Sequence, residues 1–415
     1  MEHPLRDLIR NNKLMCELAE EYGTPCYVYD QPRLVNNLRK LDSAISKHFN
    51  KYHICYAVKS NSNPHLLKTM LLTLPHLGAD CSSPGEVYVA EKSGINTKDC
   101  IYTGNYESIE DLSIALDKEC YINLDDQTSF DRLSKIKLPE RISFRLNPGF
   151  GKGEFSGITT AGNNAKFGIP ADKIMSAYSK AKDSNITRFG LQCMAGSGNL
   201  EESHFIEVMT SILHHSKIIE SKLNLSFEFI SMGGGLGIPY NEDQLSLNYD
   251  NLFKKLSDIF YEAYPNKDKA PALWIEPGKS IVGDTGFILS TVTGIKNSYK
   301  NFVGLDAGME TLMRPALYGA FHQMFKVGIH GENVGTFDFT GPICENTDRI
   351  ASNRDFPTVT EGDLIAILDA GAYGYSMSHN FNTRPRASEV LLNGKSHRLI
   401  RRRETIKDIF SGCDV

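Results

Sequence analysis

Residues 56–63 read YAVKSNSN, a short apolar run that leads into a lysine, Lys59. The run belongs to the first of eight strand-like segments separated by polar, helix-like stretches: 53–59, 76–82, 100–104, 120–125, 141–147, 188–194, 226–233 and 272–278. Strand–helix alternation repeated about eight times predicts an α/β fold, a (β/α)8 barrel. Barrel enzymes carry their chemistry at the carboxyl ends of the strands, where an amine held against apolar walls can form a Schiff base.

The pattern changes after residue 280. Ile281-Val282, residues 287–292 and residues 389–392 read as strands with no long helix between them. The strand-like run 26–29 lies before the barrel begins and is expected to join them. We therefore predict a barrel over 30–280 and a β-rich domain formed by 1–29 plus 281–415.

The composition of the chain argues against nucleic acids and membranes as partners and against secretion. Lys and Arg number 45 against 50 Asp and Glu, giving a net charge of −5, and no basic stripe or polybasic tail suggests nucleic acid or a membrane surface as a partner. The amino-terminal residues resemble no secretory signal, and no apolar run approaches a membrane span. The nine cysteines include no C-x-x-C pair, which favours reduced thiols in a cytoplasmic protein. His214-His215 has no partner ligands nearby, so no metal site is predicted.

Polar groups gather where the predicted strands end. Strand two reaches Asp80, and strand eight ends at Glu276-Pro277-Gly278. Strands six and seven run into Gly196-Ser197-Gly198 and Gly233-Gly234-Gly235, whose backbone N–H groups can hold a phosphate. A carboxylate at the end of strand eight could pair with a protonated pyridine nitrogen. Together with Lys59, these features predict pyridoxal 5′-phosphate (PLP) as cofactor.

Longer motifs carry a family resemblance. They are YAVKSNSN at 56–63, GGGLG with PY at 233–240, EPGKSIV at 276–282, LDAGM leading to RPALYG at 305–319, GPICE at 341–345 and DAGAYGYSMSHNFNTRPR at 369–386. The chain resembles the fold-type III PLP-dependent decarboxylases, whose alanine-racemase-like barrel is followed by a β-domain. Within that group it looks most like the bacterial diaminopimelate decarboxylases, from about residue 25 to 409.

The resemblance implies roles for individual residues. Lys59 would be catalytic and hold PLP, with cofactor contacts from Asp80, Met194, Ser197, Gly234, Gly235, Glu276, Gly278, Lys279 and Tyr373. Substrate contacts would come from Lys279, Arg314, Tyr318, Glu345 and Tyr373. Cys344 would be the second catalytic residue, a proton donor. With Glu345 it would reach across a homodimer interface into the neighbour's site.

Each assignment has a plainer alternative, and the chain departs from the family at several positions. Cys344 could be a core thiol, Arg314 a surface ion pair and Tyr373 a packing residue. Met194 stands where the family usually has a histidine against the cofactor ring, and Gln192 replaces another common histidine. Lys279 replaces an arginine, and Asn346-Thr347 stands where a Ser-Gly pair is usual.

The resemblance predicts decarboxylation of an amino acid, meso-diaminopimelate, to L-lysine and CO2. A first alternative is a paralogue that decarboxylates another amino acid, such as a D- or L-diamino acid or a precursor in specialised metabolism. A second is a racemase or epimerase that uses Lys59 and Cys344 as its two bases. A third is an inactive PLP-binding regulatory protein.

Overall fold

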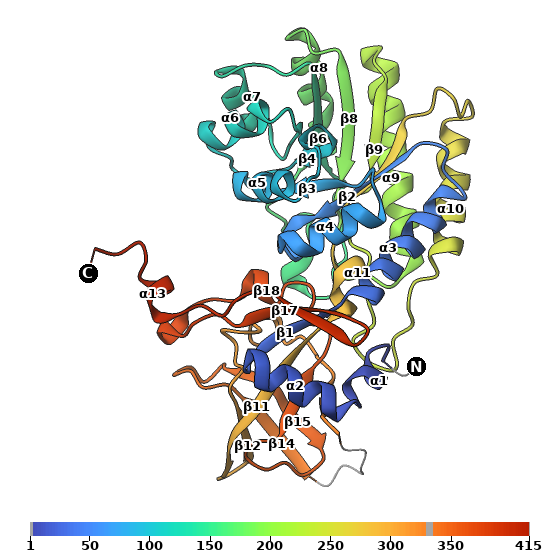
Figure 1. Ribbon diagram of the computed structural model, residues 1–415. Helices are drawn as coiled ribbons and strands as arrows, with labels where there is room; N and C mark the ends of the chain where they lie inside the picture. The colour runs from blue at the N-terminus through green and yellow to red at the C-terminus, as the bar shows by residue number, and fades with distance from the viewer. Residues whose placement is uncertain (1–2, 329–334, 415) are drawn as a thin grey trace. The chain divides into compact units, whose positions relative to one another are not determined.

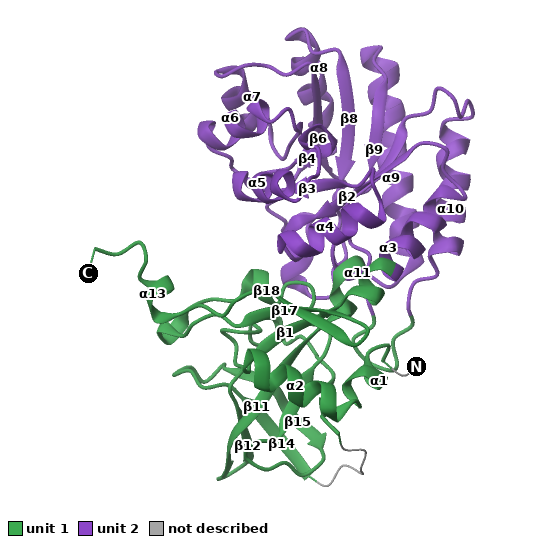
Figure 2. Cartoon of the chain, viewed as in Figure 1, with its two compact units in different colours: residues 1–35, 239–245, 281–415 green, residues 36–238, 246–280 purple. Residues whose placement is uncertain are grey.

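The chain forms two compact units in a computed structural model that describes residues 3–328 and 335–414. Unit 1 comprises residues 1–35, 239–245 and 281–415, and unit 2 comprises residues 36–238 and 246–280 (Figure 2). As domain boundaries we continue to propose 30–280 for the barrel and 1–29 plus 281–415 for the β-rich domain.

Unit 2 is built on a closed, all-parallel barrel, which confirms the predicted fold class. Its strands pair in sequence order, and the last of them pairs with the first. They are β2 (Tyr52–Ala57), β3 (Gly78–Cys81), β4 (Cys100–Tyr102), β5 (Tyr121–Leu124), β6 (Arg141–Asn147), β8 (Arg188–Cys193), β9 (Phe227–Ser231) and β10 (Ala272–Ile275). The two-residue β7 (Ile169–Pro170) adds to β6. All eight predicted segments therefore hold strands, although most of the strands are shorter than predicted.

Helices connect successive strands and lie around them (Figure 1). They are α4 (Pro64–Thr73), α5 (Pro84–Lys92), α6 (Ile109–Asp117), α7 (Gln127–Ser134), α8 (Ile174–Asp183), α9 (Glu202–Leu223) and α10 (Tyr249–Ala263), with α3 (Gln31–Ser46) before β2. Local chemistry sets where they begin. Asn63 accepts the His65 N–H at 3.0 Å and Pro64 occupies the first turn, so α4 begins soon after Lys59. Short 3-10 turns are η1 (Val58–Ser60), η2 (Thr97–Asp99) and η3 (Ser156–Ile158).

The barrel interior differs between its two ends. Toward the amino ends of the strands it is filled by aromatic side chains: Phe229 stacks on Trp274 at 4.0 Å, and Tyr121 meets Phe229 edge-on at 4.7 Å. The barrel is therefore a packed core there and not a pore. Toward the carboxyl ends the interior is polar, with hydrogen-bonded residues from neighbouring strands such as Ser143 and Asn123, 2.8 Å apart.

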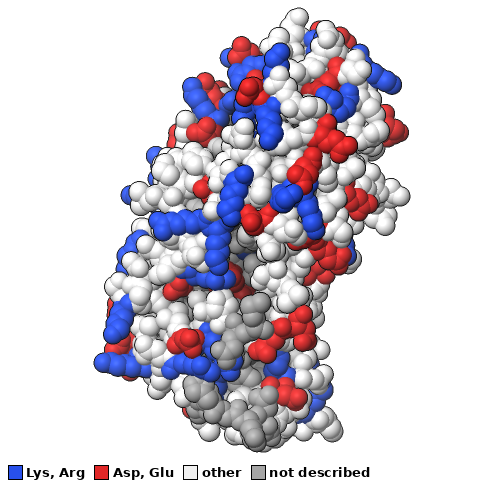
Figure 3. Space-filling model, turned by 90° about the vertical axis from the view of Figure 1, so that its right-hand side faces the viewer, with Lys and Arg blue, Asp and Glu red and all other residues white. Residues whose placement is uncertain are grey.

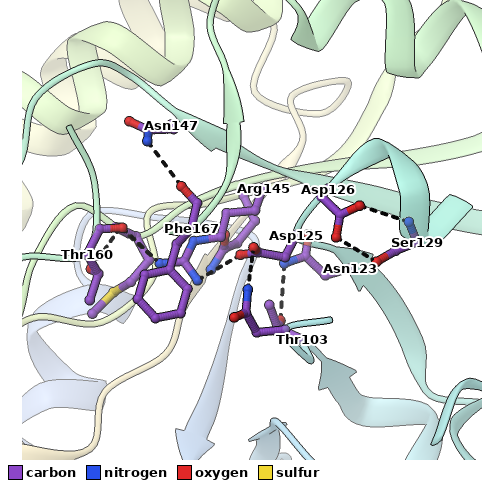
Figure 4. A network of polar contacts seen from close by, with 12 residues as sticks. Thr103, Asn123, Asp125, Asp126, Ser129, Arg145, Asn147, Thr160 and Phe167 are labelled. Atoms are coloured by element: carbon purple, nitrogen blue, oxygen red, sulfur yellow. Dashed lines mark hydrogen bonds and ion pairs between the residues drawn. The ribbon is translucent and has the colours of Figure 1, made fainter. Parts of the chain in front are cut away.

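A polar network at this end holds the long loop that follows β6 (Figure 4). The buried Arg145 pairs with Asp125 at 3.2 Å and donates to the carbonyl oxygens of Thr160 and Met194. Asn147 donates to the carbonyl oxygens of Gly162 and Phe167. The loop is thus fixed by side chains of β6 itself, which places it over the carboxyl ends of the strands.

Unit 1 contains a mixed sheet of strands ordered β15-β14-β12-β11-β1-β17-β18, with β16 paired to β11 and β13. The strands are β1 (Cys26–Asp30), β11 (Gly286–Asn297), β12 (Asn301–Leu305), β13 (Met324–Lys326), β14 (Gly335–Thr340), β15 (Arg349–Phe356), β16 (Leu364–Ile367), β17 (Ser388–Asn393) and β18 (Ser396–Arg401). As predicted, the early strand β1 joins the late strands: it lies antiparallel to β11 and parallel to β17. Val28, Phe287 and Val390 belong to one apolar core cluster.

The helices of unit 1 are short, apart from α2. They are α1 (Arg6–Ile9), α2 (Asn12–Tyr22), α12 (Arg314–Tyr318) and α13 (Ile406–Ile409), with turns η4 (Gly283–Thr285), η5 (Tyr375–Met377) and η6 (Phe381–Thr383). One sequence prediction is wrong here. Ile281-Val282 is not a strand but the end of α11 (Lys279–Val282), because the chain turns through one helical turn before β11 begins.

Lys and Arg side chains are interspersed with Asp and Glu on the face shown in Figure 3. Over residues 3–328 and 335–414, no helix is long and apolar enough to cross a membrane. The nine cysteines carry free thiols, of which only those of Cys344 and Cys413 are exposed and that of Cys16 is partly so.

Candidate active site

Lys59 lies just beyond the carboxyl end of β2. The strand ends at Ala57, and Lys59 is the middle residue of η1, so it is not the last strand residue that the sequence predicted. Its ammonium Nζ lies 2.6 Å from Oδ2 of Asp80 on the neighbouring β3. The side chain of Asp80 is 3% exposed and that of Lys59 is 44% exposed. The amine is therefore held by a buried carboxylate at an open position and not by the apolar walls that we expected.

Glu276 directly follows the last barrel strand and, with Lys59 and Asp80, makes up what we call the barrel-mouth cluster. Its Oε1 accepts a hydrogen bond from the Ser231 hydroxyl at 2.6 Å, and its Oε2 accepts one from Nε2 of Gln192 at 2.9 Å. Burial, and next the negative charge of Asp80, raise the pKa of Glu276 to about 7. The hydrogen bonds and the Lys59 charge act in the opposite direction. Lys59, Asp80 and Glu276 thus form one electrostatic group.

The two glycine-rich loops after β8 and β9 pair with each other. The Asn199 N–H donates to the Gly235 carbonyl and the Gly237 N–H to the Asn199 carbonyl, both at 2.9 Å. Gly235 has φ +89°, which L side chains rarely adopt, and a Cβ on Gly234 would lie 2.2 Å from the Glu276 carbonyl oxygen. Only glycine fits this close approach of loop and strand end. Ser197 is partly exposed, and its carbonyl accepts the Glu154 N–H at 2.9 Å.

Two departures from the family lie beside these loops. Sδ of Met194 accepts a hydrogen bond from the Gly234 N–H at 3.2 Å, so the thioether contacts the second glycine-rich loop. Lys279 is 4% exposed, and its Nζ pairs with Oε2 of Glu154 at 2.6 Å. The acidic partner comes from the loop that Arg145 and Asn147 hold in place.

The residues of unit 2 fit a cofactor with a pyridine ring, an aldehyde and a phosphate. Oδ1 of Asp80 and Oε1 of Gln192 are buried acceptors without a hydrogen-bond partner among the described residues. Such atoms call for a donor from outside the chain. A Cβ on Gly278 would lie 2.0 Å from Oγ of Ser60, so only glycine fits beside Ser60 at this strand end. An amine, buried carboxylates and glycine loops therefore meet at one end of the barrel.

Apart from Lys279, the predicted substrate residues lie in unit 1. Arg314 begins α12 and is 2% exposed, so it is not a surface ion-pair residue. Its Nη1 lies 2.9 Å from Nε2 of His322, whose Nδ1 donates to the Leu368 carbonyl at 2.7 Å. The Arg314 guanidinium also lies 4.6 Å from the Tyr240 ring centre. Tyr318, at the end of the same helix, is partly exposed.

Cys344 and Glu345 lie on an exposed turn between β14 and β15, so Cys344 is not a core thiol. Asp348 holds the turn in place: its carboxylate accepts hydrogen bonds from the N–H groups of Met309 and Ile343 at 2.7 and 3.0 Å. The Cys344 N–H donates to Oδ1 of Asn382 at 2.7 Å. These contacts present the thiol and the carboxylate outward.

Tyr373 lies in the loop between β16 and β17. It has φ +57° and is partly exposed, between the buried Ala372 and Gly374. A tyrosine with this backbone conformation is uncommon, and such residues cluster at functional sites. Its role stays a prediction.

Comparison with known proteins assigns the family. The model for the pyridoxal-dependent decarboxylase, pyridoxal binding domain, matches residues 35–283. The chain belongs to the pyridoxal-dependent decarboxylases. It is 37% identical over 403 residues to the diaminopimelate decarboxylase of Methanothermobacter thermautotrophicus, covering 96% of this chain and 94% of that protein. It is 40% identical over 399 residues to that of Thermoplasma acidophilum, covering 95% and 94%.

Solved structures agree with this membership. The diaminopimelate decarboxylase of Helicobacter pylori complexed with L-lysine superposes with a TM-score of 0.87 at 29% identity, covering 95% of this chain and 98% of that one. The enzyme from Methanocaldococcus jannaschii gives a TM-score of 0.88 at 30% identity, covering 96% and 94%. PLP is accordingly the cofactor of this decarboxylase.

Three site residues were not assigned a role from the sequence. Ser231 lies two residues before Gly233, the first residue of the glycine run, and Gln192 was noted only because it stands where the family commonly has a histidine. Both contact Glu276 in the structure. Their position at the ends of strands could have indicated this, because those side chains share the mouth of the barrel. Glu154 lies in an irregular loop and carried no sequence signal.

Proposed function

We propose that this decarboxylase converts meso-diaminopimelate to L-lysine and CO2. The observation that carries the proposal is the full-length similarity to curated diaminopimelate decarboxylases, combined with the barrel-mouth cluster of Lys59, Asp80 and Glu276. A fold alone would not select a substrate. Here similarity and site chemistry point to the same reaction.

The family resemblance assigns each cofactor contact to a single residue. Lys59 would bind its aldehyde carbon, Glu276 would face its pyridine nitrogen, and Ser197, Gly234, Gly235 and Tyr373 would bind its phosphate. When bound, the protonated ring serves as an electron sink for the charge that decarboxylation leaves behind. Asp80 keeps the lysine amine in place, and the Glu276 carboxylate holds a proton at the ring nitrogen.

Substrate recognition would use charges of opposite sign. Arg314 favours a distal carboxylate, and Glu345 favours a distal ammonium group. The substrate meso-diaminopimelate has both. Lys279 and Tyr318 would contribute further polar contacts. Cys344 would deliver a proton to the carbon that has lost CO2, and its position on an exposed turn is compatible with this role.

CO2 release from the purified holoenzyme tests the proposal. The panel comprises meso-diaminopimelate, L- and D-lysine, L- and D-ornithine, and arginine. We expect the highest kcat/KM with meso-diaminopimelate, with L-lysine as product. Turnover of another member with meso-diaminopimelate inert would contradict the proposed substrate and favour a paralogue, for which Met194 and Lys279 are the motivating departures. Racemisation without CO2 release would indicate an epimerase.

We further propose a homodimer whose two sites each use Cys344 and Glu345 from the neighbouring subunit. The exposure of both residues supports this arrangement. Mixing the inactive variants Lys59→Ala and Cys344→Ala provides the test. Shared sites predict that subunit exchange restores about a quarter of the wild-type activity, because half the subunits enter mixed dimers and each of these has one intact site. No recovery after verified exchange would contradict shared sites.

A further inference from the structure

The buried carboxylate of Glu276 has a separate hydrogen-bond donor for each of its oxygen atoms. Ser231 donates to Oε1 at 2.6 Å from the last residue of β9, and Gln192 donates to Oε2 at 2.9 Å from β8. Both donor residues are at most 1% exposed. Two donors from two strands fix the plane of the carboxylate as well as its position.

The direction of these hydrogen bonds follows from their surroundings. The Gly233 N–H donates to Oγ of Ser231 at 3.1 Å, so the serine oxygen already serves as an acceptor and its proton points to Glu276. Only the NH2 group of Gln192 can donate to a carboxylate, and its Oε1 is a buried acceptor without a hydrogen-bond partner among the described residues. The Glu276 carboxylate is therefore the hydrogen-bond acceptor for the NH2 group of Gln192.

We propose that Gln192 and Ser231 are positioning residues that clamp the Glu276 carboxylate in one orientation and favour its negatively charged form, and that Ser231 also joins it to the second glycine-rich loop. The inference rests on the proposed pairing of Glu276 with the pyridine nitrogen. A carboxylate so oriented keeps its remaining lone pairs for a donor on the ring. Through Gly233 and Ser231, the loop proposed to bind phosphate is linked to the group proposed to hold the ring nitrogen.

The clamp is needed because two influences oppose a negative charge on Glu276. These are burial and the nearby carboxylate of Asp80. The other titratable groups around Glu276 are the Lys59 amine and the buried thiols of Cys55 and Cys193. An amide and a hydroxyl do not change charge over the pH range in which proteins fold, so the clamp acts at every working pH.

The test compares Gln192→Met and Ser231→Ala with the wild-type holoenzyme. Methionine nearly matches the volume of glutamine and removes both the donor and the unpaired acceptor. The matched controls are Ser216→Ala, a buried serine in α9 whose hydroxyl donates to the Leu213 carbonyl, and Gln127→Met in α7. Two properties are measured: the pH midpoint of the visible absorbance of bound PLP, and the dissociation constant for PLP.

We expect each clamp variant to move the absorbance midpoint by at least about half a pH unit and to weaken PLP binding about tenfold, because hydrogen bonds to charged groups are strong. The controls should leave both quantities unchanged. In a Glu276→Gln background, Ser231→Ala should add less than a twofold change, because the two residues act as one unit. Midpoint and affinity equal to those of the wild type would overturn the proposal. So would an undiminished effect in the Glu276→Gln background, or a loss of thermal stability alone.

These readouts need bound cofactor and no turnover. A wild-type protein that binds PLP but releases no CO2 from any diamino acid would contradict the proposed function. The roles of Gln192 and Ser231 would still be tested by the absorbance midpoint and the dissociation constant for PLP.

Discussion

The barrel-mouth cluster and the turn that carries Cys344 are held in place by different kinds of contact. In the cluster, Lys59, Asp80 and Glu276 are held by side-chain contacts between neighbouring strands, and the two carboxylates are nearly inaccessible. On the turn, Cys344 and Glu345 are exposed, and the contacts that hold the turn are mostly to its backbone N–H groups. The contacts in the barrel-mouth cluster therefore act on the charge of its carboxylates. The contacts on the turn fix its backbone and leave the side chains of Cys344 and Glu345 accessible.

This difference predicts how each region responds to change. Substitutions in the barrel-mouth cluster should alter both the affinity for PLP and the protonation of the cluster's side chains, because these side chains share one low-dielectric environment. Substitutions on the turn should alter turnover and leave cofactor binding intact. The following experiments test that division, from the largest expected effect to the smallest.

Lys59→Ala should have the largest effect. Without the amine, covalent attachment of PLP is lost and CO2 release should fall by more than about 10³-fold. Borohydride treatment of wild-type protein with PLP, followed by peptide mapping, should label Lys59. A label on another lysine would contradict the assignment of Lys59 as the PLP-binding lysine, and with it the placement of the cofactor at the barrel-mouth cluster.

Glu276→Gln should lower kcat by about 10² to 10³-fold, because it removes preorganised charge from a buried site. The visible spectrum of the bound cofactor should change at the same time. An altered rate with an unaltered spectrum would place the effect of Glu276 elsewhere than at the ring.

Cys344→Ala should lower kcat by about 10²-fold, the scale of general acid catalysis, and should leave PLP affinity at the wild-type value. Exposure also predicts that iodoacetamide modifies Cys344 and Cys413 well before the buried Cys55 or Cys193. The two rates can be compared in one peptide map. Weakened PLP binding in Cys344→Ala would contradict the prediction that changes on the turn leave cofactor binding intact.

Met194→His should lower kcat with meso-diaminopimelate by about threefold to tenfold, because an imidazole cannot reproduce the contact between the thioether and the Gly234 N–H while matching its shape. Met175→His on α8 is the control. If rates across the whole substrate panel stay the same, the role assigned to position 194 is wrong.

The pH dependence of thermal stability should show the smallest effect. In the folded apoprotein, burial and then the charge of Asp80 raise the pKa of Glu276 from its ordinary value of 4.5 to about 7, so the folded state keeps a proton that the unfolded chain releases. The stabilisation is complete below pH 4.5 and is lost as pH rises through about 7. Relative to Glu276→Gln, the wild-type Tm should therefore fall by a few degrees, roughly 2 to 4 °C, between pH 5 and pH 8. A constant difference would contradict the raised pKa.

The same contrast explains what the sequence could predict. Barrel strands show as regular apolar runs, so their approximate positions could be predicted from periodicity, and Lys59, Asp80 and Glu276 were noticed because they lie near the predicted ends. Irregular loops have no period. Cys344, Glu345 and Tyr373 were reached only through family resemblance, and the pairing of Glu154 with Lys279 was not anticipated. The helical turn at Ile281-Val282 was misread because two β-branched residues favour a strand locally, although the chain must change direction there.

The placement of β1 has a consequence for biosynthesis. Tyr29 on this strand donates a hydrogen bond to Glu389, 360 residues later in the chain, and β1 lies between β11 and β17. A ribosome adds on the order of ten residues per second, so the first strand waits roughly half a minute before both of its neighbours have emerged. During that time an apolar strand with two open edges is available to other nascent chains. Shielding by a chaperone, or the early docking of α2, would determine how much of the newly made protein escapes aggregation.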